Sequence, residues 1–212
     1  MIINLLCDNK NSWFWNTCGD FIKNIEQEGH EVNLCKSEAK LVKADISAFI
    51  SCTKLVSSNG LKKSKSNIVC HPSDLPFGRG FSPIAWEVLN NKEELTFTLF
   101  EAEEGADEGE IYLKNKVKLN GTELNNELRS IQSTITYDMI LKYIKEYPDN
   151  KSAPQVGEST WYKKRSPIDS EININKTVLE QINLFRIVDN ENYPAFFYYK
   201  GQKFILKIDK EI

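Results

Sequence analysis

Two residues of this sequence have the types and the setting that proton transfer requires. His71 lies in a loop stiffened by Pro72 and Pro76, and Asp107 lies in a second turn between glycines. An imidazole takes up a proton near neutral pH, and a carboxylate beside it can orient the ring and stabilise its charged form. We therefore expect His71 to act as a general base and Asp107 to act as its orienting partner.

Each residue also has a simpler interpretation. A single histidine is more often structural than catalytic, and the acidic run that contains Asp107 could be no more than a solvated surface. The glycines at 78 and 80 favour the catalytic interpretation, because they allow the backbone to approach a ligand closely. His30 follows a predicted helix end at Gly29, and we expect it to be structural.

The elements that would position these loops alternate between strands and helices. Apolar runs predict strands at 1–7, 31–35, 45–52, 67–70, 95–100 and 111–119. Helical spacing predicts helices that end near 29 and span 83–89, 122–146 and 177–187, and a hairpin is predicted at 195–199 and 203–208. This order indicates an α/β fold: a Rossmann-like, mostly parallel sheet with flanking helices, plus a small C-terminal helix and β-hairpin. Ligands bind at the carboxyl ends of such strands, where the His71 loop falls.

We divide the chain into a catalytic core at 1–147 and an appendage of loop, helix and hairpin at 148–212. Residues 149–170 are polar, and we expect them to be a loop. The first strand is followed by Asp8-Asn-Lys-Asn-Ser12, without glycine, which excludes a classical dinucleotide site.

Composition excludes several classes of protein. The net charge of −3 opposes a nucleic-acid partner, and the five cysteines form no Cys-x-x-Cys pair, so we expect no metal site and no disulfide framework. We find no signal peptide and no apolar run long enough to span a membrane. The chain is therefore expected to be cytoplasmic, with no membrane partner.

The motifs around the two loops resemble those of one enzyme family. The pattern His-Pro-Ser-x-Leu-Pro-x-x-Arg-Gly-x-x-Pro-Ile begins at His71, and Glu-x-Gly-x-Asp-x-Gly contains Asp107, with the strand Thr-Phe-Thr-Leu-Phe between them. Together they resemble the formyltransferases that use N10-formyltetrahydrofolate, which include methionyl-tRNA formyltransferase and the nucleotide-sugar N-formyltransferases. The resemblance covers residues 45–120. The segment 160–169 resembles the loop that follows the long helix in family members, and 184–197 with the predicted hairpin is similar to the short C-terminal end of the sugar enzymes.

The resemblance implies roles for three loops and a co-substrate. His71 and Asp107 would be catalytic, and N10-formyltetrahydrofolate would be bound by Lys54, Leu55, Val56, Ser73, Asp74, Leu75, Pro76, Glu103, Glu104, Gly105, Ala106 and Asp107. Aromatic and basic residues of the types that stack a base or pair with a diphosphate are candidates for the acceptor: Asn9, Asn11, Trp13, Tyr162, Lys163 and Arg165. The run Trp13-Phe14-Trp15 is equally well explained as a core or dimer cluster.

One position departs from the family pattern. Family members carry an asparagine two residues before the histidine, whereas this chain has Val69, which cannot donate a hydrogen bond. Asn67 lies two residues before Val69 and four before His71. We hypothesise that protonated His71 or a backbone N–H stabilises the developing negative charge instead.

The function implied is transfer of a formyl group from N10-formyltetrahydrofolate to the amine of a nucleotide-linked amino sugar. The resemblance places this reaction in the biosynthesis of bacterial surface glycans, for example those with pseudaminic-type acids. A tRNA enzyme would carry an additional C-terminal barrel domain, for which we expect no room here. Three alternatives stay open: a formyltetrahydrofolate hydrolase, an aminoacyl or peptidyl formyltransferase, and a non-catalytic folate-binding module. The partner expected is therefore a small nucleotide sugar, and a homodimer stays open.

Overall fold

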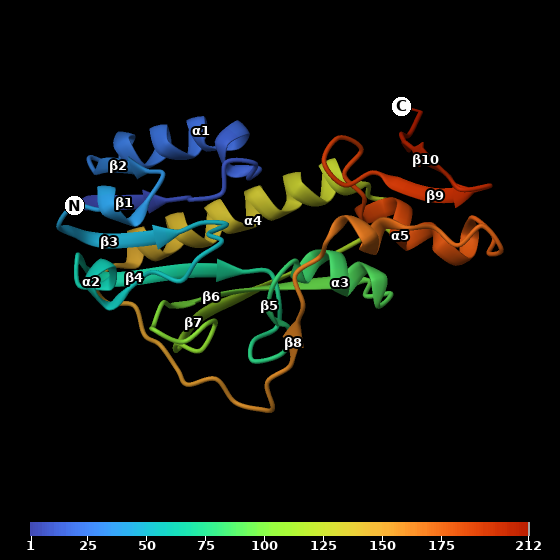
Figure 1. Cartoon of the computed structure of the whole chain (residues 1–212). Coiled ribbons are helices and arrows are strands. Elements are labelled where there is room, and N and C mark those ends of the chain that lie inside the picture. Colours follow the sequence, from blue (N-terminus) through green and yellow to red (C-terminus); the bar gives the residue numbers. More distant parts are fainter. Residues whose placement is uncertain (212) are drawn as a thin grey trace.

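A six-stranded sheet forms the centre of the computed structural model, which describes residues 1–211 (Figure 1). The strand order is β2-β1-β3-β4-β6-β7. Strands β1 to β4 pair in parallel, and β6 and β7 are antiparallel additions at one edge. The strands are β1 (Ile2–Leu6), β2 (Glu31–Cys35), β3 (Ala44–Phe49), β4 (Ser64–His71), β6 (Glu94–Glu101) and β7 (Ile111–Lys118). The predicted α/β class with a mostly parallel sheet is confirmed.

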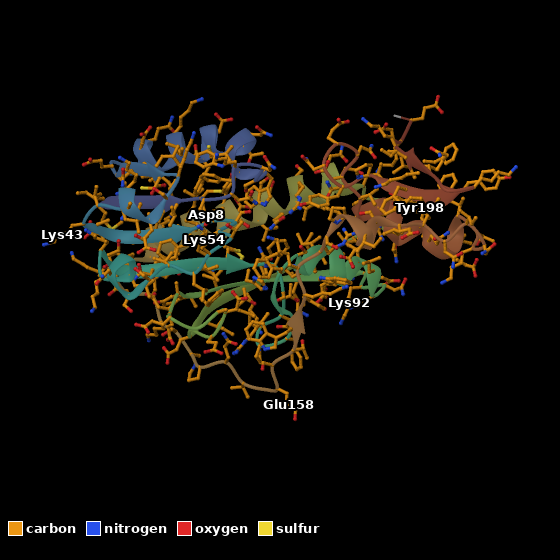
Figure 2. All side chains as sticks on the ribbon, in the orientation of Figure 1. Asp8, Lys43, Lys54, Lys92, Glu158 and Tyr198 are labelled. Carbon is orange, nitrogen blue, oxygen red and sulfur yellow. The ribbon has the colours of Figure 1, made fainter. Side chains whose placement is uncertain are left out.

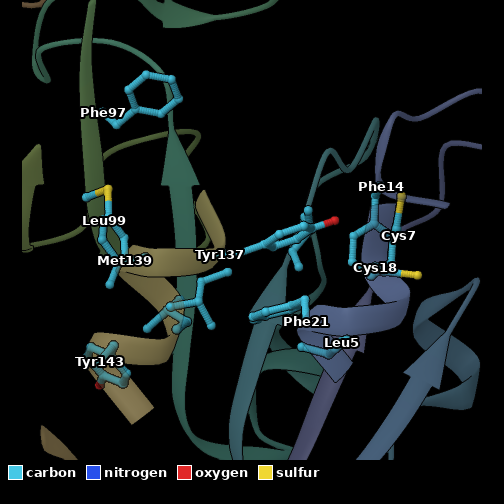
Figure 3. Packing of buried hydrophobic residues seen from close by; sticks show 14 of the residues in the cluster. Leu5, Cys7, Phe14, Cys18, Phe21, Phe97, Leu99, Tyr137, Met139 and Tyr143 are labelled. Atoms are coloured by element: carbon cyan, nitrogen blue, oxygen red, sulfur yellow. The ribbon is translucent and has the colours of Figure 1, made fainter. Parts of the chain in front are cut away.

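Two helices contact each other over the main core, α1 (Phe14–Gln27) and α4 (Asn125–Glu146). Helix α1 buries the apolar residues that recur at helical spacing along it, and the chain turns at Gly29, whose φ is +81°. The Phe21 ring stacks on the Tyr137 ring of α4 with centroids 4.2 Å apart (Figure 3). Helix α3 (Pro83–Leu89) adds Ile84 and Val88 to the same cluster.

A smaller apolar cluster lies apart from the main core. Leu6, Cys35, Leu41 and Phe49 are buried there, next to the short helix α2 (Ser58–Leu61). Successive residues of a strand point to opposite faces, so Leu5 enters the main core while Leu6 enters this one. The sheet therefore has an apolar cluster on each face, and its carboxyl edge is left to loops.

The C-terminal segment packs beside α3 and α4 through helix α5 (Ile182–Ile187). Arg186 on α5 pairs with Glu123 just before α4 at 2.9 Å, and both side chains are buried. The predicted hairpin is present as β9 (Ala195–Tyr199) and β10 (Gln202–Leu206), and it extends away from the sheet (Figure 1). The predicted helix at 177–187 is split into a 3₁₀ turn, Leu179–Gln181, and α5.

The structure corrects the prediction that residues 149–170 are entirely loop. Strand β8 (Trp161–Tyr162) pairs in parallel with β5 (Arg79–Gly80), and Pro167–Ser170 forms a 3₁₀ turn. Strands of two residues carry no period that a sequence could reveal, because pairing with a distant segment creates them. Strand β4 is also longer than the predicted 67–70, and it ends on His71.

No helix within residues 1–211 has the length and apolar character needed to cross a membrane. All five cysteines are free, and Cys7, Cys18 and Cys35 are buried.

Candidate active site

His71 is the last residue of β4, at the carboxyl edge of the sheet. Its side chain is 9% exposed, and Nε2 lies 2.9 Å from the carbonyl oxygen of Gly78. A carbonyl can only accept, so Nε2 carries the proton of the neutral ring and Nδ1 holds the free lone pair. Nδ1 faces Asp107, with 3.8 Å between it and Oδ1. The lone pair of His71, the potential base, thus lies on the side of the ring that faces the Asp107 carboxylate.

Asp107 is held in an uncommon backbone conformation. Its φ is 55°, in the left-handed region, which costs a residue other than glycine roughly 1 kcal/mol or more. The other carboxylate oxygen, Oδ2, accepts a hydrogen bond from the backbone N–H of Gly80 at 2.8 Å. The acidic turn is therefore tied to the loop that follows His71, and the two sequence motifs form one unit.

A third segment, which we call the strap (residues 153–162), holds these two loops together. Gln155 donates from Nε2 to the carbonyl oxygens of Asp107 and Gly109, at 2.9 Å each, and its Oε1 accepts from Arg79 at 2.8 Å. Thr160 Oγ1 accepts from the N–H of Gly78 at 2.8 Å. Sequence reasoning missed both residues, because they belong to no motif and lie in a stretch predicted to be polar loop.

The glycines of the His71 loop make room for the strap. A Cβ at Gly80 would lie 2.6 Å from the backbone oxygen of Tyr162, and one at Gly78 would lie 2.7 Å from the Tyr162 ring. Both residues also have positive φ. The atoms that approach each glycine most closely therefore belong to Tyr162 in the strap of this chain.

A cavity of about 640 Å³ opens beside His71 and Asp107, both of which line it. This volume lies within the range of small-molecule sites. The predicted folate residues in its lining are Lys54, Leu55, Val56, Glu103, Gly105, Ala106 and Asp107. Lys54 is labelled in Figure 2, beyond the end of β3. Two of the three predicted folate segments therefore line the same cavity as His71 and Asp107.

The remaining predicted folate residues lie elsewhere in the described chain. Ser73 and Leu75 are each 1% exposed, and neither lines the cavity. Asp74 pairs with Lys114, and the Pro76 carbonyl accepts from the strap. Glu104 lies outside the lining as well. A direct role for these residues in folate binding stays a prediction.

Of the predicted acceptor residues, Asn9, Asn11, Trp13 and Arg165 line the cavity. Tyr162 and Lys163 do not: the Tyr162 hydroxyl donates to Glu87, and Lys163 pairs with Asp169. Trp13 lines the cavity, and its ring also packs on Phe14 and Tyr137 of the core; its role in acceptor binding stays a prediction.

The position of the expected oxyanion donor is apolar, and the structure gives Asn67 other contacts. Val69 lines the cavity. Asn67 is not in the lining, and its Nδ2 donates to the carbonyl of Leu61 at 3.1 Å. Protonated His71 and backbone N–H groups thus remain the hypothesised donors.

Two cavity cysteines are poorly suited to nucleophilic chemistry. Cys52 and Cys70 both line the cavity. Burial raises the pKa of each thiol to about 12, so at neutral pH neither forms a useful amount of thiolate.

Comparison with known sequences identifies relatives of this architecture. The family model described as formyl transferase matches residues 15–139. The methionyl-tRNA formyltransferase of Malacoplasma penetrans is 29% identical over 121 residues, which are 55% of this chain and 37% of that protein. The methionyl-tRNA formyltransferase of Lachnospira eligens is 25% identical over 179 residues, 82% of this chain and 56% of that protein. The match thus spans only about a third to half of the length of these curated relatives.

Solved structures share the fold at lower identity. A methionyl-tRNA formyltransferase from Clostridium thermocellum superposes with a TM-score of 0.82 and 23% identity, covering 100% of this chain and 93% of that one. A sugar N-formyltransferase from a Shewanella species superposes with a TM-score of 0.75 and 14% identity, and the match covers 100% of this chain and 98% of that one. HypX from Aquifex aeolicus, in complex with tetrahydrofolic acid, superposes with a TM-score of 0.76 and 17% identity, and the match covers 97% of this chain and 37% of that one.

Proposed function

The chain belongs to the formyl transferase family, and from this premise we propose that it transfers a formyl group from N10-formyltetrahydrofolate to the amine of a nucleotide-linked amino sugar. The observation that carries the proposal is the His71–Asp107 pair, which faces a cavity of about 640 Å³ at the carboxyl edge of the sheet. This is where α/β sheets bind their ligands.

The residues of the cavity fit a folate co-substrate. Leu55 and Val56 offer apolar surface to a flat ring, and the turn at 103–107 exposes backbone groups that can read its donor and acceptor edge. The solved HypX structure holds tetrahydrofolic acid in the same fold. Bound there, the co-substrate supplies an electrophilic formyl carbon.

Proton transfer is the task of His71. Because Nε2–H is engaged by Gly78, the Nδ1 lone pair removes the proton from the attacking amine. Asp107, whose Oδ1 lies 3.8 Å from Nδ1, then stabilises the imidazolium by its charge. The imidazolium or a backbone N–H would stabilise the negative charge that develops on the formyl oxygen, and His71 would return its proton to the N10 nitrogen of the folate as the bond between N10 and the formyl carbon breaks.

Three observations bear on the acceptor. The fold of a sugar N-formyltransferase covers this chain end to end, as does that of a methionyl-tRNA formyltransferase, so the fold is compatible with a small amino sugar of surface-glycan biosynthesis but does not select it. The names of the two sequence relatives favour a second candidate, the amine of methionyl-tRNA. The chain's net charge of −3 is a weaker fit to tRNA, whose phosphates require a basic surface.

An acceptor panel tests the proposal. Wild-type protein is incubated with N10-formyltetrahydrofolate and UDP-, GDP- or dTDP-linked amino sugars, or with methionyl-tRNA, and products are analysed by mass spectrometry. The proposal predicts that one amino sugar gains the mass of a carbonyl group. Formylation of methionyl-tRNA alone would support the second candidate, and formate release without any acceptor would indicate a hydrolase.

A further inference from the structure

A group of basic residues lines the cavity outside the catalytic pair. Arg129 lies on α4, and Lys164 and Arg165 follow β8; all three face the cavity. We propose that Arg129 and Arg165, assisted by Lys164, form an anion subsite that binds the diphosphate of the acceptor. The choice of a diphosphate rests on the proposed function, whereas the need for an anion follows from the contacts of these residues.

Arg129 forms no ion pair within residues 1–211. Its guanidinium donates from Nη1 to Gln132 Oε1 at 2.9 Å, a neighbour on the same helix. Asp189 is close enough to act on the charge of Arg129, but its carboxylate accepts from the N–H groups of Glu191 and Asn192 at 2.9 and 3.0 Å. The acid near Arg129 is therefore already engaged.

Arg165 is in a similar position. Its Nη2 donates to the carbonyl of Asp169 at 2.9 Å and more weakly to Ser170 Oγ at 3.4 Å. In the described chain its Nε is buried without a hydrogen-bond partner. The Asp169 carboxylate is occupied by Lys163 and by the N–H of Ser166. The guanidinium thus keeps donors that no protein group satisfies.

The two arginines also repel each other. The side chain of Arg129 is exposed to solvent, but protein atoms crowd around its guanidinium, and the resulting loss of hydration lowers its pKa; the charge of Arg165 acts in the same direction. Burial lowers the pKa of Arg165 too. Both remain charged at neutral pH, because an arginine side chain titrates far above it. Asp189 and Asp169 offset these charges only in part, because both carboxylates already accept hydrogen bonds from other groups, and like charges in this setting favour the entry of an anion.

The geometry of the donors selects the kind of anion. Guanidinium groups present pairs of N–H donors that match the oxygens of a phosphate, and Lys164 adds a flexible point charge. A diphosphate carries two or more negative charges, which suits three cations better than a single carboxylate does. Trp13 and Tyr193 line the same cavity and offer rings for the groups on either side of the phosphates.

The test is direct binding, measured by calorimetry with UDP, GDP, dTDP, their nucleosides and inorganic pyrophosphate. The variants are R129Q and R165Q, with K142Q as the control, because Lys142 is an exposed cation on the same helix. We expect a nucleoside diphosphate to bind the wild type, and each arginine variant to weaken it about tenfold or more. K142Q should stay within about twofold of the wild type.

Two results would overturn the subsite. One is a failure of the diphosphate assay to separate the proteins, either because R129Q, R165Q and the wild type bind a nucleoside diphosphate with equal affinity or because the wild type does not bind it. The other is a loss of tetrahydrofolate affinity in the variants with diphosphate binding unchanged, which would assign the cations to the glutamate of folate. Since binding needs no formyl transfer, the subsite and the proposed function can fail separately.

Discussion

The side-chain amide of Gln155 donates to the backbone carbonyl of Asp107 at 2.9 Å, across 48 residues of sequence. The same nitrogen donates to Gly109, and the amide oxygen accepts from Arg79. Gln155 thus fixes the acidic turn at the point where Asp107 adopts a positive φ. It touches no reacting atom, and we interpret it as a positioning residue for the His71–Asp107 pair.

Replacement of Gln155 by alanine should lower kcat about 10- to 100-fold, because small displacements of a catalytic group reduce rate steeply. The KM for the formyl donor should change little, since Gln155 is not in the cavity lining. Steady-state kinetics across a range of pH measures both and shows whether the kcat profile changes. K151A, a change at an exposed residue just before the strap, is the control. An unchanged kcat in Q155A would disprove the positioning role.

The buried pair Glu123–Arg186 should anchor the C-terminal segment to the catalytic core. R186M leaves the Glu123 carboxylate buried beside two backbone N–H donors but without its cation. We expect a loss of about 3–5 kcal/mol in the free energy of unfolding, measured by urea titration, and partial recovery in E123Q/R186M.

The exposed pair Lys210–Glu127 provides the comparison for that loss. K210A should cost less than about 1 kcal/mol, because surface ion pairs contribute little. Equal effects of R186M and K210A would show that burial does not govern the Glu123–Arg186 pair.

The cavity thiols Cys52 and Cys70 should react slowly with iodoacetamide at pH 8. Their pKa values are raised to about 12 by burial, so the thiolate fraction at that pH is on the order of 10⁻⁴. The alkylation rate should rise about tenfold per pH unit between 8 and 10, as deprotonation increases toward the raised pKa. Peptide mass spectrometry reports each site. Rapid, pH-independent labelling of either thiol in folded protein would contradict the raised pKa values.

Much of the scaffold could be predicted from apolar periodicity. Short apolar runs located the strands of the main sheet, including the one that ends on His71, because a strand with apolar clusters on both faces is apolar at successive positions. The motifs located His71 and Asp107, which the structure brings to within 3.8 Å.

What could not be predicted depends on contacts between distant segments. Gln155 and Thr160 are ordinary polar residues until the strap crosses the His71 loop. Arg129 is an exposed residue of α4, as expected for an arginine on a helix, and only the folded arrangement shows that it also lines the cavity. Ser73 and Leu75 stand within the motif and yet are buried away from the cavity, because membership of a motif does not fix the direction of a side chain.

The central claim is that His71 removes a proton from an acceptor amine so that a formyl group can be transferred to it. The most direct test measures tetrahydrofolate formation and formylated product together, with and without the accepted amino sugar, in wild type and in H71N. We predict acceptor-dependent turnover with equal amounts of both products, and a loss of roughly 10²- to 10⁴-fold in H71N with folate affinity retained. Full turnover in H71N, or tetrahydrofolate formed without acceptor and with formate as the only other product, would contradict it.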